Sequence, residues 1–281
     1  MYYPKNFKHS RALQLAELVT QAYQQYWSFN KDKDWKLHGN YQLITELRYE
    51  GQFSSTLKNI PSFFRKEVGE WSRQKDSDKR GVPIGFIASH KSNVYLVFRG
   101  TSTTKEWLRD LNLHLSHFKY KNGVSVHEGF NDLYELFREN IFKTLSGLKG
   151  KKLYITGHSL GSALATLTAM DIACNMDIKL PRVYTFASPR VGDRKFSKEY
   201  NIFYKDRSFR IANTCDLVVS MPLPVPFLGF IGGYFTHTQA ALEFTHQFED
   251  LDKNHSLDTY LAFLKSTPRN RLSALYFNSL T

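Results

Sequence analysis

Apolar residues near the start of the chain recur every three or four positions, with polar residues between them. This spacing predicts an amphipathic helix. A secretory signal needs an unbroken apolar core of about 7–15 residues, and Gln14, Glu17 and Gln21 interrupt such a core here. We therefore expect a first helix rather than a secretory leader. Its apolar face would comprise Leu15, Leu18, Val19, Ala22 and Tyr26.

Short apolar runs rich in β-branched and aromatic residues occur later in the chain. Residues 82–90 and 93–100 are separated only by Lys91 and Ser92, which predicts a β-hairpin. Further on, strand-like runs alternate with a helical pattern at 162–174. This alternation is typical of an α/β fold with a mostly parallel central sheet flanked by helices. The later predicted strands are residues 151–157, 181–189 and 209–219.

Residues 217–242 carry no Asp, Glu, Lys or Arg, and the stretch is long enough to cross a bilayer. However, Pro222, Pro224 and Pro226 remove helix donors and favour extended backbone. A single spanning helix is therefore not expected. Two interpretations remain open: an apolar loop beside a pocket or at a lipid surface, and a buried loop that closes the core.

The composition narrows the range of partners. The 281 residues contain 38 Lys and Arg against 26 Asp and Glu, a formal net charge of +12. Basic chains bind nucleic acid, anionic membranes or no particular partner. Here the basic residues are scattered, with neither zinc-ligand spacing nor an aromatic-basic strand. We expect no nucleic-acid partner, no metal and no cofactor, and, without repeats or linkers, a single domain over 1–281.

The segment Gly157-His158-Ser159-Leu160-Gly161 matches G-x-S-x-G and lies between a predicted strand and a predicted helix. That is the context of a nucleophile elbow, a strained turn that exposes a reactive serine. The glycines are needed because a side chain there would clash with the neighbouring strand or helix. The backbone N–H of Leu160, at the start of the helix, would form half of an oxyanion hole. The alternative is an ordinary turn with a surface serine.

Five further blocks accompany this motif. In order, the chain contains FRGTSTTKEWLRDLNL (98–113), VHEGF (126–130), ITGHSLGSALATL (155–167), FASPRVGD (186–193), CDLVVSMPLP (215–224) and NHSLDTYLAF (254–263). Together these blocks resemble the class 3 lipase family, the fungal-lipase-like branch of the α/β hydrolases. The resemblance covers most of the chain. It implies an α/β-hydrolase domain with a helical lid and an enzyme that hydrolyses lipid or other carboxyl esters.

The resemblance also implies a catalytic triad of Ser159, Asp216 and His255, in the chain order that α/β hydrolases use. Ser159 would be the nucleophile and His255 the general base, while Asp216 would orient the imidazole. The second oxyanion donor, beside Leu160, would be Thr101, which follows the FRG triplet. The sequence here reads DLVVSMP, which departs from the family's D-[IL]-V-P block.

Other roles for these residues stay open at this point. Asp216 could be a simple turn residue, and His255 could cap the helix that follows it. His237 and His246 are rivals for the role of base. His158, inside the motif, is interpreted as a packing residue.

The family places a mobile lid after the FRG block, here at about residues 102–116. A capping-box pattern, T-x-x-E at 103–106, predicts a short helix there. Asp110 is expected to contact Thr101 or Arg99 when the lid opens. A fixed amphipathic helix on the core is the alternative. The apolar face of the helix, which would cover the substrate groove, comprises Trp107, Leu108, Leu111 and Leu115.

Cys174 and Cys215 are the only cysteines, and whether they form a bridge stays open. Secreted fungal members of the family carry several disulfides, so this chain departs from them. With neither a secretory leader nor a spanning helix expected, the prediction is a cytoplasmic protein. Association with a membrane surface and export by a route without a signal are the alternatives.

The sequence thus predicts a lipase that cleaves acyl esters of glycerolipids at a membrane or droplet surface, through an acyl-enzyme intermediate. A phospholipase A1 or a general acyl esterase is the close alternative, because pocket size decides between them. A non-catalytic lipid- or partner-binding protein on a lipase fold is an alternative of another class. The presence of all three triad residues argues against it.

Overall fold

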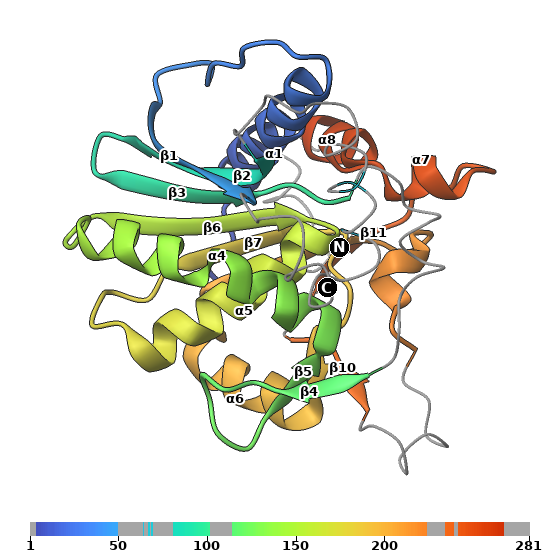
Figure 1. The fold of residues 1–281 in the computed structure, drawn as a ribbon. Helices are drawn as coiled ribbons and strands as arrows, with labels where there is room; N and C mark the ends of the chain where they lie inside the picture. Colours follow the sequence, from blue (N-terminus) through green and yellow to red (C-terminus); the bar gives the residue numbers. More distant parts are fainter. Residues whose placement is uncertain are drawn as a thin grey trace, which may run out of the picture.

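Seven strands form a central sheet within the described part of the chain, in the order β1-β2-β3-β6-β7-β9-β11. Helices cover both faces of this sheet (Figure 1). The predicted α/β architecture is therefore confirmed. The computed structural model describes residues 4–49, 64, 67, 69, 81–101, 114–223, 234–238 and 241–266.

The predicted hairpin forms one side of the sheet. β2 (Val82–His90) and β3 (Asn93–Phe98) pair antiparallel around Lys91-Ser92, and β1 (Gln42–Tyr49) adds antiparallel to β2. From β3 onward all neighbours run parallel, so the carboxyl ends of these strands meet at one edge. The parallel strands after β3 are β6 (Lys152–His158), β7 (Arg182–Phe186), β9 (Ser208–Asn213) and β11 (Ala241–Phe244).

The strands divide their side chains between two cores. In β3, Leu96 and Phe98 belong to one core, whereas Tyr95 and Val97 belong to the other. This alternation follows from the two-residue period of a strand. A sheet buried on both faces needs apolar residues at every position, which explains the continuous apolar runs in the sequence.

Each core is closed by its own helices (Figure 1). The predicted first helix is confirmed as α1 (His9–Asn30), which packs with α8 (Leu257–Ser266) over one face. α4 (Glu128–Ser146) and α5 (Leu160–Asn175) cover the opposite face. α5 is buried nearly all around along most of its length, as expected for a helix without a polar stripe.

A small second sheet was not predicted. Its strands are only two or three residues long, and its order is β10-β8-β5-β4. α6 (Arg194–Tyr204) follows β8 directly and packs beside this sheet. The strands are β4 (Leu115–His117), β5 (Ser125–His127), β8 (Gly192–Asp193) and β10 (Phe235–Thr236).

This sheet corrects the boundary of the predicted lid. Leu115 was assigned to a helical lid over about 102–116, but it is the first residue of β4 and pairs with His127. Pairing with β5 satisfies backbone groups that a helix would have satisfied internally, so a helical lid cannot extend to 116. The other predicted lid residues, Trp107, Leu108, Asp110 and Leu111, lie outside the described residues.

The strand that leads into the charge-free stretch is shorter than predicted. The predicted strand 209–219 ends early, at Asn213, and a 3-10 turn, η2 (Leu217–Ser220), follows. The reason is local: the Asp216 carboxylate accepts a hydrogen bond from the N–H of Val218 at 2.9 Å and caps this turn. No helix in the described part of the chain is both long and apolar enough to cross a membrane.

The two cysteines are separate free thiols. Cys174 lies near the end of α5, and Cys215 lies between β9 and η2. The fold is therefore held without a disulfide between them.

Candidate active site

Ser159 occupies the sharp turn between β6 and α5. Its φ of 56° and ψ of −125° lie in a region that non-glycine residues rarely adopt. The turn is held because the Ser159 N–H donates to the carbonyl of Phe186 at 3.0 Å. Ser162 reinforces it, since its hydroxyl lies 2.7 Å from the carbonyl oxygen of Gly157 and 2.8 Å from that of Phe186. This is the strained geometry expected of a nucleophile elbow.

The glycines of the motif allow close backbone contacts. A Cβ on Gly157 would lie 2.2 Å from the carbonyl oxygen of Gly161, and a Cβ on Gly161 would lie 2.4 Å from that of Arg99. A Cβ on Gly100 would lie 2.9 Å from the Cβ of Ser159. The 99–101 segment therefore packs directly against the elbow. This contact brings Gly100, the residue before Thr101, against the serine, and the role of Thr101 as an oxyanion donor stays a prediction.

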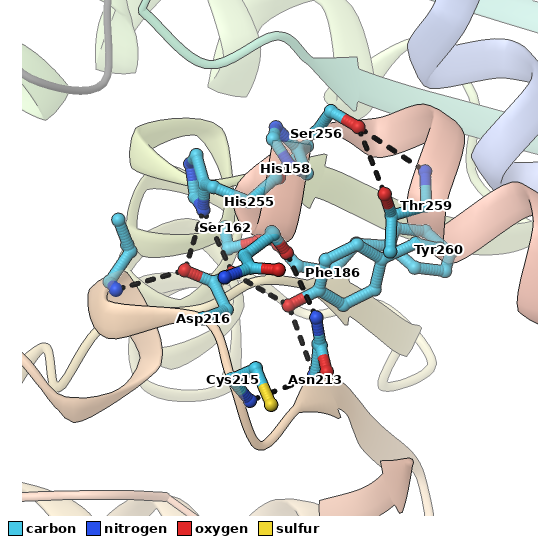
Figure 2. A network of polar contacts seen from close by, with 12 residues as sticks. His158, Ser162, Phe186, Asn213, Cys215, Asp216, His255, Ser256, Thr259 and Tyr260 are labelled. Carbon is cyan, nitrogen blue, oxygen red and sulfur yellow. Dashed lines mark hydrogen bonds and ion pairs between the residues drawn. The ribbon is translucent and has the colours of Figure 1, made fainter. Parts of the chain in front are cut away.

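Asp216 and His255 meet at the carboxyl edge of the sheet. Asp216 follows β9, and His255 is the last residue of α7 (Leu251–His255). The Nδ1 of His255 lies 2.8 Å from Oδ2 of Asp216 and 3.0 Å from Oδ1, and both side chains are at least 95% buried. Figure 2 shows the two side chains facing each other. An acceptor-only carboxylate at Nδ1 fixes the proton there and leaves Nε2 free to take a proton.

Two residues that sequence reasoning missed hold this acid–base pair in place (Figure 2). The hydroxyl of Tyr260 donates to Oδ2 of Asp216 at 2.7 Å, and it accepts from the N–H of Asn213 at 3.1 Å. The amide of Asn213 donates to the carbonyl of Asn254, the residue before His255, at 3.0 Å. Tyr260 was hidden in the apolar pattern of α8, where its ring packs and only its hydroxyl is functional.

His158 is more than the packing residue predicted from the motif. Its Nε2 lies 2.8 Å from the carbonyl oxygen of His255, and its Nδ1 lies 2.8 Å from the hydroxyl of Tyr23. The carbonyl can only accept, so Nε2 carries the proton. Burial, and then the neighbouring His255, hold the pKa of His158 well below its usual value, so the ring is neutral and Nδ1 accepts from Tyr23.

Tyr23 extends this chain of hydrogen bonds to the oxyanion loop. Its oxygen accepts from the N–H of Gly100 at 3.0 Å, while its O–H donates to His158. Burial raises the pKa of Tyr23, which keeps the phenol protonated. We call the path Gly100–Tyr23–His158–His255 the Tyr23 bridge. It joins the backbone beside Thr101 to the backbone of the histidine that contacts Asp216.

Arg99 fixes the same loop from its other side. The guanidinium is fully buried and donates to the carbonyl of Pro83 at 2.8 Å and to that of Gly100 at 2.7 Å. Its third nitrogen, Nη2, donates to Oε2 of Glu67 at 2.7 Å. The central carbon of the guanidinium lies 3.8 Å from the centre of the Tyr26 ring. Glu67 comes from the polar stretch before β2, for which sequence analysis predicted no role. The predicted contact between Asp110 and Arg99 or Thr101 is not tested, because Asp110 lies outside the described residues.

The rival residues take other roles. His237 donates through Nε2 to the carbonyl of Val219 at 2.6 Å, and burial lowers its pKa to about 3, far from the range of a general base. His246 is exposed and stacks on Phe248. Asp193 caps α6 by accepting from the N–H of Phe196 at 2.6 Å. Among the described residues, no group of three or more His, Cys, Asp or Glu side chains is placed to hold a metal ion.

Comparison with known proteins agrees with this geometry. Residues 95–225 match the family described as lipase (class 3). The secreted mono- and diacylglycerol lipase A of Penicillium cyclopium is 32% identical over 145 residues, which make up 50% of this chain and 47% of that protein. A chloroplastic phospholipase A(1) of Arabidopsis thaliana is 34% identical over 155 residues, 47% of this chain and 34% of that protein. The chain thus spans about half or less of the length of these relatives.

A solved structure shows the same fold over most of the chain. The crystal structure of the lipase from Rhizopus microsporus var. chinensis aligns with a TM-score of 0.57 at 18% identity, covering 85% of this chain and 76% of that one. The segment matched by the family contains both the elbow and the acid residue, Ser159 and Asp216. Fold, elbow geometry and sequence relatives agree: over residues 95–225 this chain matches the class 3 lipase family, and its relatives include lipases of that kind.

Proposed function

We propose that this protein is a serine ester hydrolase that cleaves acyl esters of glycerolipids. One observation carries the proposal: a buried contact of 2.8 Å between His255 and Asp216 forms in the same fold that holds Ser159 in a strained elbow. The imidazole of His158, which borders the elbow, has its ring centre 4.7 Å from that of His255. This arrangement supports His255 as the general base for Ser159.

Acylation follows from the positions of these groups. The hydroxyl oxygen of Ser159 attacks the acyl carbon of the ester while Nε2 of His255 takes the hydroxyl proton. The negative charge that develops on the carbonyl oxygen is met by the backbone N–H groups of Thr101 and Leu160. The intermediate then collapses, the alcohol leaves with the proton from His255, and the acyl group stays on Ser159. Asp216 stabilises the imidazolium during these steps.

Deacylation reverses the roles. Water attacks the acyl carbon while His255 takes one of its protons, and the second tetrahedral intermediate expels Ser159. The proton returns to the serine oxygen, and a free carboxylic acid leaves. Each cycle consumes one ester and one water and releases one alcohol and one acid, so no cofactor is required for the balance.

The names of the relatives support the choice of substrate class. They include mono- and diacylglycerol lipases and phospholipases A1, whose common substrate is an acyl ester of glycerol. The partner of this chain would therefore be a lipid at a membrane or droplet surface. A phospholipase A1 is the second candidate, because chloroplastic phospholipases of this type are among its relatives.

Two measurements test the proposal together. A fluorophosphonate probe should label the protein at Ser159, because only an activated serine attacks the phosphorus. Hydrolysis should then be measured on p-nitrophenyl esters of increasing acyl length, and on emulsified diacylglycerol, triacylglycerol and phosphatidylcholine. Release of the acid from glycerolipids, lost in Ser159→Ala, is the expected result.

Lack of labelling together with lack of ester hydrolysis would overturn the enzyme assignment. Binding of lipid without turnover would then favour the non-catalytic class. Cleavage of phosphatidylcholine at the first glycerol position, with little cleavage of triacylglycerol, would select the phospholipase A1.

A further inference from the structure

α6 presents a row of basic side chains to solvent. Arg194, Lys198 and Lys205 are exposed, and none has an ion-pair partner in the described part of the chain. Two of the three nearby carboxylates are committed elsewhere: Glu199 pairs with Lys121 at 3.2 Å, and Asp193 caps the helix. The third, Asp206, follows Lys205 and is outnumbered by the cations around it. The segment 190–210 contains seven basic and three acidic residues. This face therefore carries an uncompensated positive charge.

The same side chains border an open groove of about 550 Å³, the α6 groove. None of its lining residues is acidic, and Ile202 exposes 67% of its surface beside the lysines. An exposed aliphatic side chain among cations is typical of surfaces that rest on a charged lipid layer. The lining comprises Arg194, Ser197, Lys198, Asn201, Ile202, Lys205, Thr236 and His237.

The α6 groove is joined to the segment that carries the catalytic acid. The hydroxyl of Ser197 donates to the carbonyl of Thr236 at 2.8 Å, which fixes α6 against β10. His237, the next residue, donates to the carbonyl of Val219 at 2.6 Å. Val219 lies in η2, the turn that Asp216 caps. A ligand bound at the groove would therefore lie close to η2, the turn that Asp216 caps.

The segments joined to the groove, η2 and β10, are flanked or begun by further exposed apolar side chains. Leu217 begins η2 and exposes 51% of its surface, Leu223 follows η2 and exposes 54%, and Tyr234, just before β10, exposes 47%. Large apolar side chains seldom lie exposed together without a binding partner. The positive field also reaches this region, because Arg210 and Arg190 add to burial in lowering the pKa of His237.

We propose that the α6 groove binds the phosphate headgroups of an anionic phospholipid bilayer and docks the catalytic end of the protein on it. The cations meet the phosphates, while Ile202, Leu217, Leu223 and Tyr234 contact the acyl boundary. The partner is a bilayer rather than free phosphate, because the apolar side chains need an apolar phase beside the charges. The proposal rests on the proposed function only in taking a lipid surface as the place of action.

The test uses the full chain and vesicles. Co-sedimentation is measured with vesicles of phosphatidylcholine containing about one third phosphatidylglycerol, and with phosphatidylcholine alone. The Lys198→Glu/Lys205→Glu variant should bind anionic vesicles about 30-fold more weakly than the parent, since each basic residue near such a surface contributes about 1 kcal/mol. Parent binding should also fall as salt rises, while inorganic phosphate at the same ionic strength should not compete beyond that effect.

A matched control separates a site from net charge. Lys149→Glu/Lys151→Glu makes the same charge change at two exposed lysines that precede β6, at the opposite end of the sheet from Ser159. This control should keep most of its affinity for anionic vesicles. Both variants should hydrolyse a soluble short-chain p-nitrophenyl ester at the parent rate, because neither site touches the triad.

Equal losses in the two variants, or unchanged binding in Lys198→Glu/Lys205→Glu, would overturn the α6 groove as the docking site. Equal binding of the parent to neutral and anionic vesicles would overturn it as well. Failure of the parent to hydrolyse any ester would contradict the proposed function instead, and the vesicle result would stand separately.

Discussion

Replacing Tyr23 with Phe tests whether the Tyr23 bridge supports catalysis. The substitution removes one oxygen and keeps the ring, which packs edge-on against His158 with centres 5.8 Å apart. Two hydrogen bonds disappear with this oxygen: the one from the N–H of Gly100, at 3.0 Å, and the one to Nδ1 of His158, at 2.8 Å. Both partners are buried, so water cannot readily replace the hydroxyl.

The expected cost follows from these two contacts. A buried polar group that loses its partner costs about 1–3 kcal/mol, so the two contacts of the bridge are together worth about 2–6 kcal/mol if nothing relaxes. Part of this cost will appear as lower stability and part as misplacement of the loop that carries Thr101. Removing one oxyanion donor outright lowers kcat by about 100-fold to 1,000-fold. Displacing a donor is milder, so we expect kcat to fall about 10-fold to 100-fold.

The assay compares kcat and KM on a soluble p-nitrophenyl ester with the midpoint of thermal unfolding. Loss of oxyanion alignment should lower kcat and leave KM within about twofold, because the donors act mainly in the transition state. Tyr200→Phe is the matched control: Tyr200 lies in α6, away from the elbow, and its buried hydroxyl donates to that of Ser208 in β9 at 3.0 Å. It should lower stability with kcat unchanged.

A Tyr23→Phe variant with the parent kcat would refute the reasoning, whatever its stability. Equal losses of kcat in the Tyr23→Phe and Tyr200→Phe variants would also refute it, because the effect would then be one of general destabilisation. The two measurements together therefore distinguish a positioning role from a purely structural one.

Four further outcomes are expected. Ser159→Ala should lower kcat by about 10,000-fold or more and leave the thermal midpoint unchanged or higher, measured on the same ester. Tyr260→Phe removes one donor to Asp216, so kcat should fall about 10-fold with unchanged KM; an unaltered kcat would exclude Tyr260 as a positioning residue. Gly157→Ala places a methyl group 2.2 Å from a carbonyl oxygen, and denaturant unfolding should show a loss of about 3 kcal/mol or more. Burial, with Glu128 and Glu135, raises the pKa of Asp132 to about 6, so stability falls as pH rises from about 4 through 6. Asp132→Asn should therefore stabilise at pH 8, and not below pH 4, by about 1 kcal/mol once solvent screening of this partly exposed group is counted.

Local patterns in the sequence were sufficient for the elements whose causes are local. The hairpin of β2 and β3, the strand β6 and the first helix α1 were predicted because apolar periodicity reports directly on which faces are buried. The elbow was predicted because glycines and a serine at fixed spacing describe one backbone turn. The strand β9 was predicted too long, because the pattern did not show that Asp216 caps a turn.

Only the tertiary structure decided which polar residues act together. Asp193 ends β8 and Asp216 follows β9, but the first caps α6 while the second meets His255, 39 residues away along the chain. Tyr23 and His158 are separated by 135 residues, and no periodicity links two side chains that meet across a core. The sequence by itself therefore determined the resemblance to the class 3 lipase family, the α/β layers and the position of the elbow at Ser159. The partners of His255 depended on the order of the strands in the sheet, because residues far apart in the sequence form hydrogen bonds only when the fold brings them within a few ångströms. The cationic face of α6 likewise depended on how that helix packs, because packing decides which charged side chains lie together at the surface.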